Sequence, residues 1–230
     1  MTEPGSDGGV IRAVLFDIDG TLLVTGGAGG RAWQHAFDEL YGVDANVAER
    51  TDAGMTDPEI ARIVFRKATG REGSVEERAK AIGCYLKHLP ETVAESEGYQ
   101  VMPGIEALLD RLIDGGYLLG IVTGNVEAAA HIKLARAGLN RFFSFGGYGS
   151  DSPDRTEVTE TAIGRGSLVS GGSLSDGACI GVGDTPRDIS ACHAAGIKVV
   201  GVATGSYSVT ELRDAGADWA IETVEAGFPT

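Results

Sequence analysis

The chain has 230 residues and a formal net charge of −14, and hydrophobic residues make up 43% of it. This apolar share is enough for a packed core and excludes a globally disordered chain, and the length allows one large domain or one domain with an insertion. The acidic balance argues against nucleic-acid binding, because contact with a phosphate backbone needs clustered Lys and Arg. An acidic protein that handles an anionic substrate needs local positive potential, which a metal ion or helix N-termini can supply.

Targeting signals and disulfides are not expected. The N-terminal stretch MTEPGSDGG is polar, and no apolar run approaches the ~20 residues that span a bilayer, so we expect a cytoplasmic protein with no membrane partner. The cysteines are odd in number and without metal-ligand spacing, which favours free thiols in a reducing compartment: they are Cys84, Cys179 and Cys192. The histidines match no ligand or triad pattern and are expected to be structural: they are His35, His88, His131 and His193.

Short apolar runs alternate with helical patterns through most of the chain. The continuous apolar character of IRAVLFDI (11–18) indicates a strand buried on both faces, as in a parallel sheet. The alternation predicts an α/β fold, a doubly wound, Rossmann-like parallel sheet with helices on both faces. The remaining predicted strands are 116–124, 141–149, 178–184, 197–205 and 218–224.

The segment from 25 to 98 departs from this alternation. It contains no convincing strand, and SVEERAKAIGCYLKHL opens with a Ser74/Glu77 capping box before an apolar helical pattern. We predict an all-helical cap domain at 25–98, inserted into a discontinuous core domain of 1–24 and 99–230.

Three loops are also predicted from local sequence. TGGAGGRA (25–32) is interpreted as a glycine-rich hinge into the cap. In GMTDPEI, Asp57 is interpreted as a helix N-cap with Pro58 at the first helical position, and a substrate-facing loop is the alternative. The Gly/Ser-rich stretch 164–178 is interpreted as a flexible surface loop.

Polar side chains follow each of the first four long strands. In an open parallel sheet, ligands bind beyond the carboxyl ends of the strands. If strands 11–18 and 178–184 are neighbours, the carboxylates of Asp17, Asp19, Asp184 and Asp188 meet there. They repel one another unless a cation binds or protons are taken up. Oxygen-only ligands favour a hard divalent cation, with Mg²⁺ the default. The residues concerned are Asp17, Asp19 and Thr21, then Thr123, Gly124 and Asn125, then Asp151, Asp154 and Arg155, and finally Asp184 and Asp188.

These residues carry a family resemblance. DIDGTLL (17–23) resembles the first motif of the haloacid dehalogenase-like hydrolases, D-x-D-G-T-L, IVTGN (121–125) resembles their second motif, and GVGDTPRD (181–188) resembles their fourth. The motifs occur in the right order, each at a predicted strand end. The helical insertion is similar to the cap of the phosphoglycolate phosphatase and β-phosphoglucomutase branch.

The resemblance implies a role for each carboxylate. Asp17 would be the nucleophile that forms an aspartyl-phosphate, and it would also ligate Mg²⁺. Asp19 would protonate the leaving oxygen and then deprotonate the attacking water, with its backbone carbonyl on the metal. Asp184 would ligate the metal directly, and Asp188 would act from behind the direct ligands, through water.

The resemblance also implies a phosphate-binding set, with one departure. Thr123 would hydrogen-bond a phosphate oxygen, and Gly124 and Asn125 would add donors at a helix N-terminus. The third motif of the family is a Lys that pairs with the phosphate and the nucleophile, but no Lys lies between Lys133 and Lys198. Arg155 is our candidate for this role, because arginine can bind phosphate bidentately, and Arg165 is the fallback.

The function that follows from these motifs is a Mg²⁺-dependent phosphatase for a small phosphorylated metabolite, with phosphoglycolate or a sugar phosphate as candidates by family analogy. The cap disfavours a phosphoprotein substrate, and Asp19 argues against a dehalogenase, because a halide leaving group needs no proton. Two alternatives stay open: a phosphosugar mutase of the β-phosphoglucomutase type and a catalytically silent binding module. The oligomeric state is left open.

Overall fold

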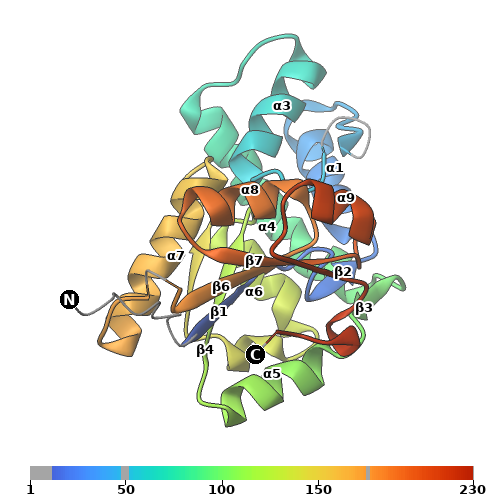
Figure 1. The fold of residues 1–230 in the computed structure, drawn as a ribbon. Helices are drawn as coiled ribbons and strands as arrows, with labels where there is room; N and C mark the ends of the chain where they lie inside the picture. The colour runs from blue at the N-terminus through green and yellow to red at the C-terminus, as the bar shows by residue number, and fades with distance from the viewer. Residues whose placement is uncertain (1–11, 48–51, 175–176, 230) are drawn as a thin grey trace, which may run out of the picture.

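A computed structural model describes residues 12–47, 52–174 and 177–229 of the chain. Within these residues the main sheet has six parallel strands in the order β5-β4-β1-β6-β7-β8 (Figure 1). The position of β1 between β4 and β6 brings the first and fourth motifs to adjacent strand ends. The strands are β1 (Ala13–Phe16), β4 (Leu118–Thr123), β5 (Phe145–Tyr148), β6 (Cys179–Gly183), β7 (Lys198–Val202) and β8 (Trp219–Ile221).

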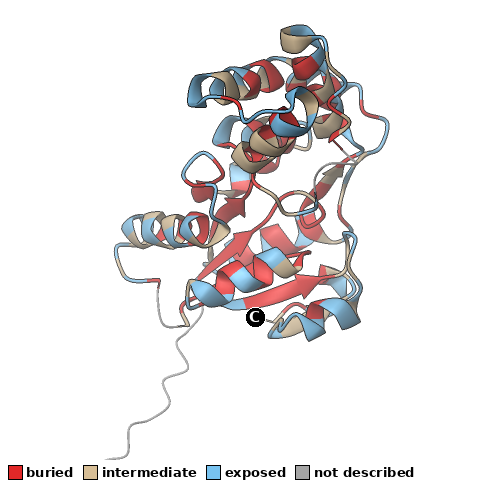
Figure 2. Cartoon of the chain, turned by 90° about the horizontal axis from the view of Figure 1, so that it is seen from above, coloured by how far each residue is buried: buried red, intermediate tan, exposed pale blue. Residues whose placement is uncertain are grey.

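Helices cover both faces of the sheet, and the alternation of side chains along β1 shows why both faces are apolar. Val14 and Phe16 belong to the core shared with α5 and α6, whereas Ala13 and Leu15 belong to the core shared with α7, α8 and α9. Figure 2 shows the strands buried between helices whose outer faces are exposed. The predicted doubly wound α/β class is confirmed. These helices are α5 (Ile105–Asp114), α6 (Glu127–Ala135), α7 (Arg155–Ser170), α8 (Pro186–Ala194) and α9 (Val209–Asp214), with short 3-10 turns η1 (Leu139–Phe142) and η2 (Val224–Ala226).

The segment between β2 (Leu23–Thr25) and β3 (Tyr99–Val101) forms a helical layer with a core of its own. It contains α1 (Ala28–Tyr41), α3 (Asp57–Thr69) and α4 (Val75–Ala94), which lie above the carboxyl ends of the strands (Figure 1). Trp33 of α1 stacks on Tyr85 of α4 with ring centroids 4.3 Å apart. The predicted Ser74/Glu77 capping box opens α4, so the local signal and the tertiary packing agree on where this helix begins.

A two-stranded ribbon joins the helical layer to the sheet domain. β2 (Leu23–Thr25) pairs antiparallel with β3 (Tyr99–Val101), and Ser96 Oγ donates to Thr25 O at 2.7 Å. These strands are not evident from the sequence because three residues are too few to establish a period of two. The boundaries predicted after residues 24 and 98 fall at this ribbon, and we retain them as a proposed division of the chain.

Two predicted loops are wrong in part. Helix α7 extends to Ser170 and so includes the first residues of the stretch 164–178, where Gly166 serves packing. A Cβ on Gly166 would lie 2.6 Å from the Phe145 ring. Likewise α1 begins at Ala28, inside the hinge predicted at 25–32. Residues 175 and 176 lie outside the described residues.

None of the described helices has both the length and the apolar character that a bilayer crossing requires.

Candidate active site

The carboxylates that follow β1 and β6 meet at the edge of the sheet. One oxygen from each of Asp17, Asp184 and Asp188 lies within 4.8 Å of the others, and all three residues are buried. Asp19 is different, because its side chain is 42% exposed and is directed at Lys133. The structure therefore gathers three of the four predicted acids into one group that could hold a cation, with Asp19 beside it.

Burial and mutual repulsion make this group expensive to ionise. Burial, with the Asp188 carboxylate as the next cause, raises the pKa of Asp17 to about 7 and that of Asp184 to about 8. Both effects disfavour the charged form, and a divalent cation bound between the oxygens would offset them. Three carboxylates without nitrogen or sulfur donors are a suitable ligand set for Mg²⁺.

The residues after Asp19 hold Asp184 in place. Gly20 has a φ of +87°, and a Cβ there would lie 2.3 Å from Asp184 Oδ2. Thr21 Oγ1 donates to Asp184 Oδ1 at 3.2 Å. Gly20 is therefore required by its backbone conformation and by the close approach of Asp184, and Thr21 contributes the hydrogen bond to the same carboxylate.

Asp188 has two roles in the structure. Its Oδ2 accepts from the backbone N and the Oγ1 of Thr185, at 3.0 and 2.7 Å. The first of these bonds, with the Asp188 N–H that donates to Thr185 Oγ1, forms the capping box of α8. Its Oδ1 makes an ion pair with Arg155. The spacing of the fourth motif thus serves the start of a helix and the site together.

Arg155 is the first residue of α7 and brings a buried positive charge to the nucleophile candidate. Its side chain is 9% exposed, and Nη2 lies 3.6 Å from Asp17 Oδ1. Burial acts to lower the pKa of Arg155, but the carboxylates of Asp188 and Asp17 outweigh it and raise this pKa. The fallback candidate Arg165 is instead held by Asp151 at 2.7 and 2.8 Å, away from the carboxylate group.

The end of β4 supplies polar groups beside Asp19. Asn125 Nδ2 donates to Asp19 Oδ2 at 2.7 Å and to Thr123 Oγ1 at 2.8 Å. Helix α6 begins two residues later, so the second motif combines a side-chain network with a helix N-terminus at one point.

Lys133 was not recognised from the sequence. Its ammonium lies 2.6 Å from Asp19 Oδ2 and 2.6 Å from Asn125 Oδ1, and its side chain is only 7% exposed. It lies two turns along α6 from Asn125, on the face that carries the buried Ala129 and Ala130. A lysine at a position where the helical pattern expects an apolar residue is the signal that could have revealed it.

The prediction for Asp57 is wrong. Thr56 is the N-cap of α3, and Asp57 is its first residue. The buried Asp57 accepts from Val126 N at 2.8 Å and donates its own N–H to Gly124 O at 2.8 Å, and burial raises its pKa to about 6. A Cβ on Gly124 would lie 2.5 Å from Met55 O, so the helical layer rests directly on the second motif.

A cavity of about 320 Å³ lies between the helical layer and the strand ends. A larger groove of about 650 Å³ opens between α3, α7 and α8 and shares Arg155 with it, but only the smaller cavity contains Asp17 and Asp19. We therefore assign the site to the smaller cavity. Its lining includes Asp17, Asp19, Thr123, Asn125, Lys133 and Arg155 from below, and Trp33, Met55, Asp57, Ile60 and Tyr85 from above.

The fold and the site together define a capped α/β enzyme with a carboxylate centre flanked by buried cations. Residues 14–202 match the family model of the haloacid dehalogenase-like hydrolases. The chain is 30% identical over 212 residues to a phosphoglycolate phosphatase of Mesorhizobium japonicum, covering 87% of this chain and 86% of the relative. It is 29% identical over 216 residues to a phosphoglycolate phosphatase of Synechococcus elongatus, covering 93% of each.

A solved structure of similar fold is a β-phosphoglucomutase from Clostridium difficile, with a TM-score of 0.71 and 21% identity over 95% of this chain and 94% of that one. The chain belongs to the haloacid dehalogenase-like hydrolase family. The predicted family, its phosphoglycolate phosphatase and β-phosphoglucomutase branch, and the enzyme class of phosphatase are confirmed.

Proposed function

We propose that this enzyme is a Mg²⁺-dependent phosphatase that hydrolyses a small phosphate monoester through an aspartyl-phosphate on Asp17. One observation carries this proposal. Asp17 belongs to a carboxylate group that could hold a metal, and its Oδ1 lies 3.6 Å from the buried guanidinium of Arg155. A phosphoryl group on Asp17 would therefore have positive charge on two sides.

The metal would be held by Asp17, Asp184 and the backbone carbonyl of Asp19. Asp188 would act on it through water. When bound, Mg²⁺ supplies charge neutralisation at the phosphoryl oxygens. The chain's residues position the other groups: Arg155 on the phosphoryl oxygens, and Thr123 with the N-terminus of α6 as hydrogen-bond donors.

Asp17 Oδ attacks phosphorus, the P–O bond to the alcohol breaks, and Asp19 gives its proton to the leaving oxygen. Asp19 then takes a proton from water, whose oxygen attacks the phosphoryl group and releases inorganic phosphate with Asp17 restored. Lys133 and Asn125 both contact Asp19 Oδ2, at 2.6 and 2.7 Å, and so hold this carboxylate toward the cavity between the two steps.

Phosphoglycolate is the proposed substrate. The cavity of about 320 Å³ suits a small molecule, and its lining includes the cations Lys133 and Arg155, which would attract a ligand that carries both a phosphate and a carboxylate. The phosphoglycolate phosphatases that match most of this chain support the same choice.

The test is a phosphate-release assay over phosphoglycolate, hexose phosphates and p-nitrophenyl phosphate, with and without Mg²⁺. We expect Mg²⁺-dependent release, highest kcat/KM for phosphoglycolate, and loss of release in Asp17→Asn but not in Asp151→Asn, a carboxylate engaged with Arg165 outside the cavity. Turnover of a hexose phosphate only with a bisphosphate activator would favour the mutase instead. Absence of turnover with every substrate would overturn the proposal.

A further inference from the structure

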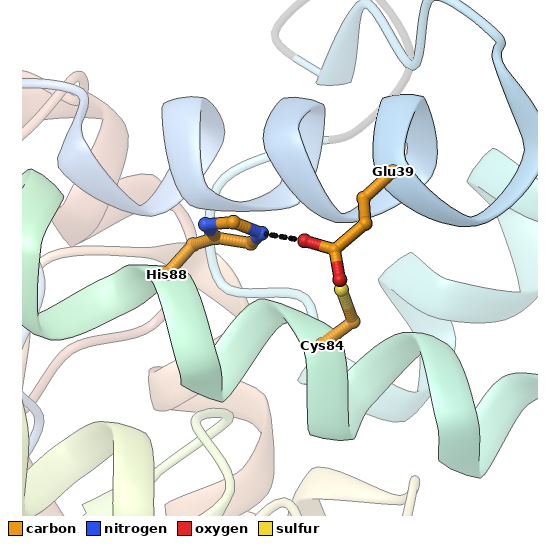
Figure 3. A group of neighbouring side chains, drawn as sticks. All are labelled: Glu39, Cys84 and His88. Atoms are coloured by element: carbon orange, nitrogen blue, oxygen red, sulfur yellow. Dashed lines mark hydrogen bonds and ion pairs between the residues drawn. The ribbon is translucent and has the colours of Figure 1, made fainter.

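We propose a Zn²⁺ site in the helical layer, formed by Glu39 of α1 and by Cys84 and His88 of α4. One ligand atom from each of the three side chains lies within 4.8 Å of the other two. Figure 3 shows the Cys84 sulfur and the His88 ring directed at the same carboxylate from neighbouring turns of α4. The inference does not depend on the proposed function.

The spacing on each helix explains the convergence. Cys84 and His88 are one turn apart, so they project from the same face of α4, and that face packs against α1. Glu39 lies opposite, with Oε2 2.7 Å from His88 Nε2. The sequence did not show this set because its ligands come from two helices that are far apart in the chain, and neither helix has enough ligands alone.

The donor set selects the metal. A thiolate, an imidazole and a carboxylate are the ligand types of Zn²⁺ sites, whereas Mg²⁺ and Ca²⁺ prefer oxygen only. Zinc would replace the Cys84 thiol proton, which passes to solvent, and the two anionic ligands would then balance the charge of the ion. The site is distinct from the carboxylate centre, which contains no sulfur or nitrogen ligand candidate among the described residues.

The Glu39–His88 pair can accept zinc with a small movement. Tetrahedral bonds of about 2.0–2.1 Å place a nitrogen and an oxygen ligand about 3.3 Å apart, so the Glu39–His88 contact of 2.7 Å would open by about 0.6 Å. Cys84 is buried, His88 is 18% exposed and Glu39 is 42% exposed, which gives the ion an entry path from solvent. We assign the fourth position to water.

Lys87 competes with the metal for Glu39. Its ammonium lies 2.7 and 2.8 Å from the two carboxylate oxygens, and its side chain is 62% exposed. A charge this exposed can swing into water when zinc binds, because exposed ion pairs contribute little. This arrangement makes a specific prediction: removal of the Lys87 charge strengthens zinc binding, whereas loss of a ligand weakens it.

The ion would join two of the helices that line the cavity from above. Cys84 is adjacent to Tyr85, and Glu39 lies on the same helix as Trp33; these two rings stack and line the cavity. A bond network from α1 through zinc to α4 would therefore fix the wall against which the substrate binds.

The test uses the full chain, reduced and saturated with Mg²⁺, titrated with Co²⁺ as a spectroscopic probe and with Zn²⁺ by calorimetry. We expect one equivalent of Co²⁺ to produce a sulfur-to-cobalt charge-transfer band that Zn²⁺ displaces. Zinc at about a hundredfold excess over Kd should raise the Tm by about 5 °C. The other cysteines are buried free thiols that belong to no ligand group among the described residues, so the band reports Cys84.

Variants separate this site from nonspecific binding. Cys84→Ser should abolish the band, His88→Gln should weaken zinc binding tenfold or more, and Lys87→Met should tighten it about twofold to fivefold. His193→Gln is the matched control, since His193 pairs with Asp218 at 3.1 Å and belongs to no ligand group among the described residues. A band that persists in Cys84→Ser, no band in the wild type, or equal zinc affinity in His88→Gln would overturn the proposal.

Discussion

Replacement of Arg155 by methionine removes the buried positive charge beside Asp17 while keeping most of the side-chain volume. The guanidinium Nη2 lies 3.6 Å from Asp17 Oδ1, and at an effective dielectric constant of about 20 two unit charges at this distance interact by about 4–5 kcal/mol. Part of this attraction is present in the ground state. Loss of one preorganised group that stabilises transition-state charge typically costs about 2.7–4 kcal/mol, so we expect kcat to fall about 10²–10³-fold.

The assay is steady-state phosphate release at saturating Mg²⁺, with kcat and KM measured separately. Arg155→Lys keeps the charge but loses the planar fork, so its kcat should lie between those of the wild type and Arg155→Met. Arg165→Met is the matched control, because Arg165 lies on the same helix and is held by Asp151 instead.

Stability must be measured alongside activity. Arg155→Met leaves the buried Asp188 without its ion-pair partner, and removal of one partner of a buried pair costs about 3–5 kcal/mol, which bound Mg²⁺ should partly offset. A melting curve at the assay Mg²⁺ concentration therefore accompanies each variant. If folded Arg155→Met keeps kcat within threefold of the wild type, or if Arg165→Met loses as much, the assignment of Arg155 to the phosphoryl group is refuted.

Three further outcomes are expected. Lys133→Met removes the ammonium that lies 2.6 Å from the carboxylate of Asp19, the proposed general acid. We expect kcat/KM to fall about 10²-fold, with His131→Gln on the same helix as the control. An equal effect of the two variants would contradict the role of Lys133. In the metal-free protein, Asp17 and Asp184 have pKa values raised to about 7 and about 8, so the folded state binds more protons than the unfolded state and its free energy of unfolding should rise as pH falls from about 8 to about 5. Urea titrations across this range should show the rise, and saturating Mg²⁺ should remove it; a metal-free stability that falls over the same range would refute the sign. Gly124→Ala places a Cβ 2.5 Å from Met55 O of the helical layer, so this layer should be displaced from the strand ends and KM for the substrate should rise. An unchanged KM would show that this contact does not affect substrate binding.

The local sequence determined the sheet and the carboxylate centre. The predicted strands of the main sheet all exist, and β1, β4, β6 and β7 do so because a continuous apolar run is buried on both faces. Asp17 and Asp184 follow two such runs directly, and adjacent parallel strands end at the same edge of the sheet. A motif at a strand end therefore also predicts where its residues lie in the fold. The capping box at Ser74 was readable for a similar reason, since its hydrogen bonds join residues three apart.

Only the tertiary structure decided which residues from separate elements meet. Lys133 approaches Asp19 because α6 packs with its buried face toward the end of β1, and Asp57 reaches Val126 because the helical layer closes onto the core. The Glu39, Cys84 and His88 group exists because α1 packs on α4. In each case the partners are distant in sequence and the local pattern of each one is ordinary, so the contact depends on packing between elements, which no short window of sequence contains.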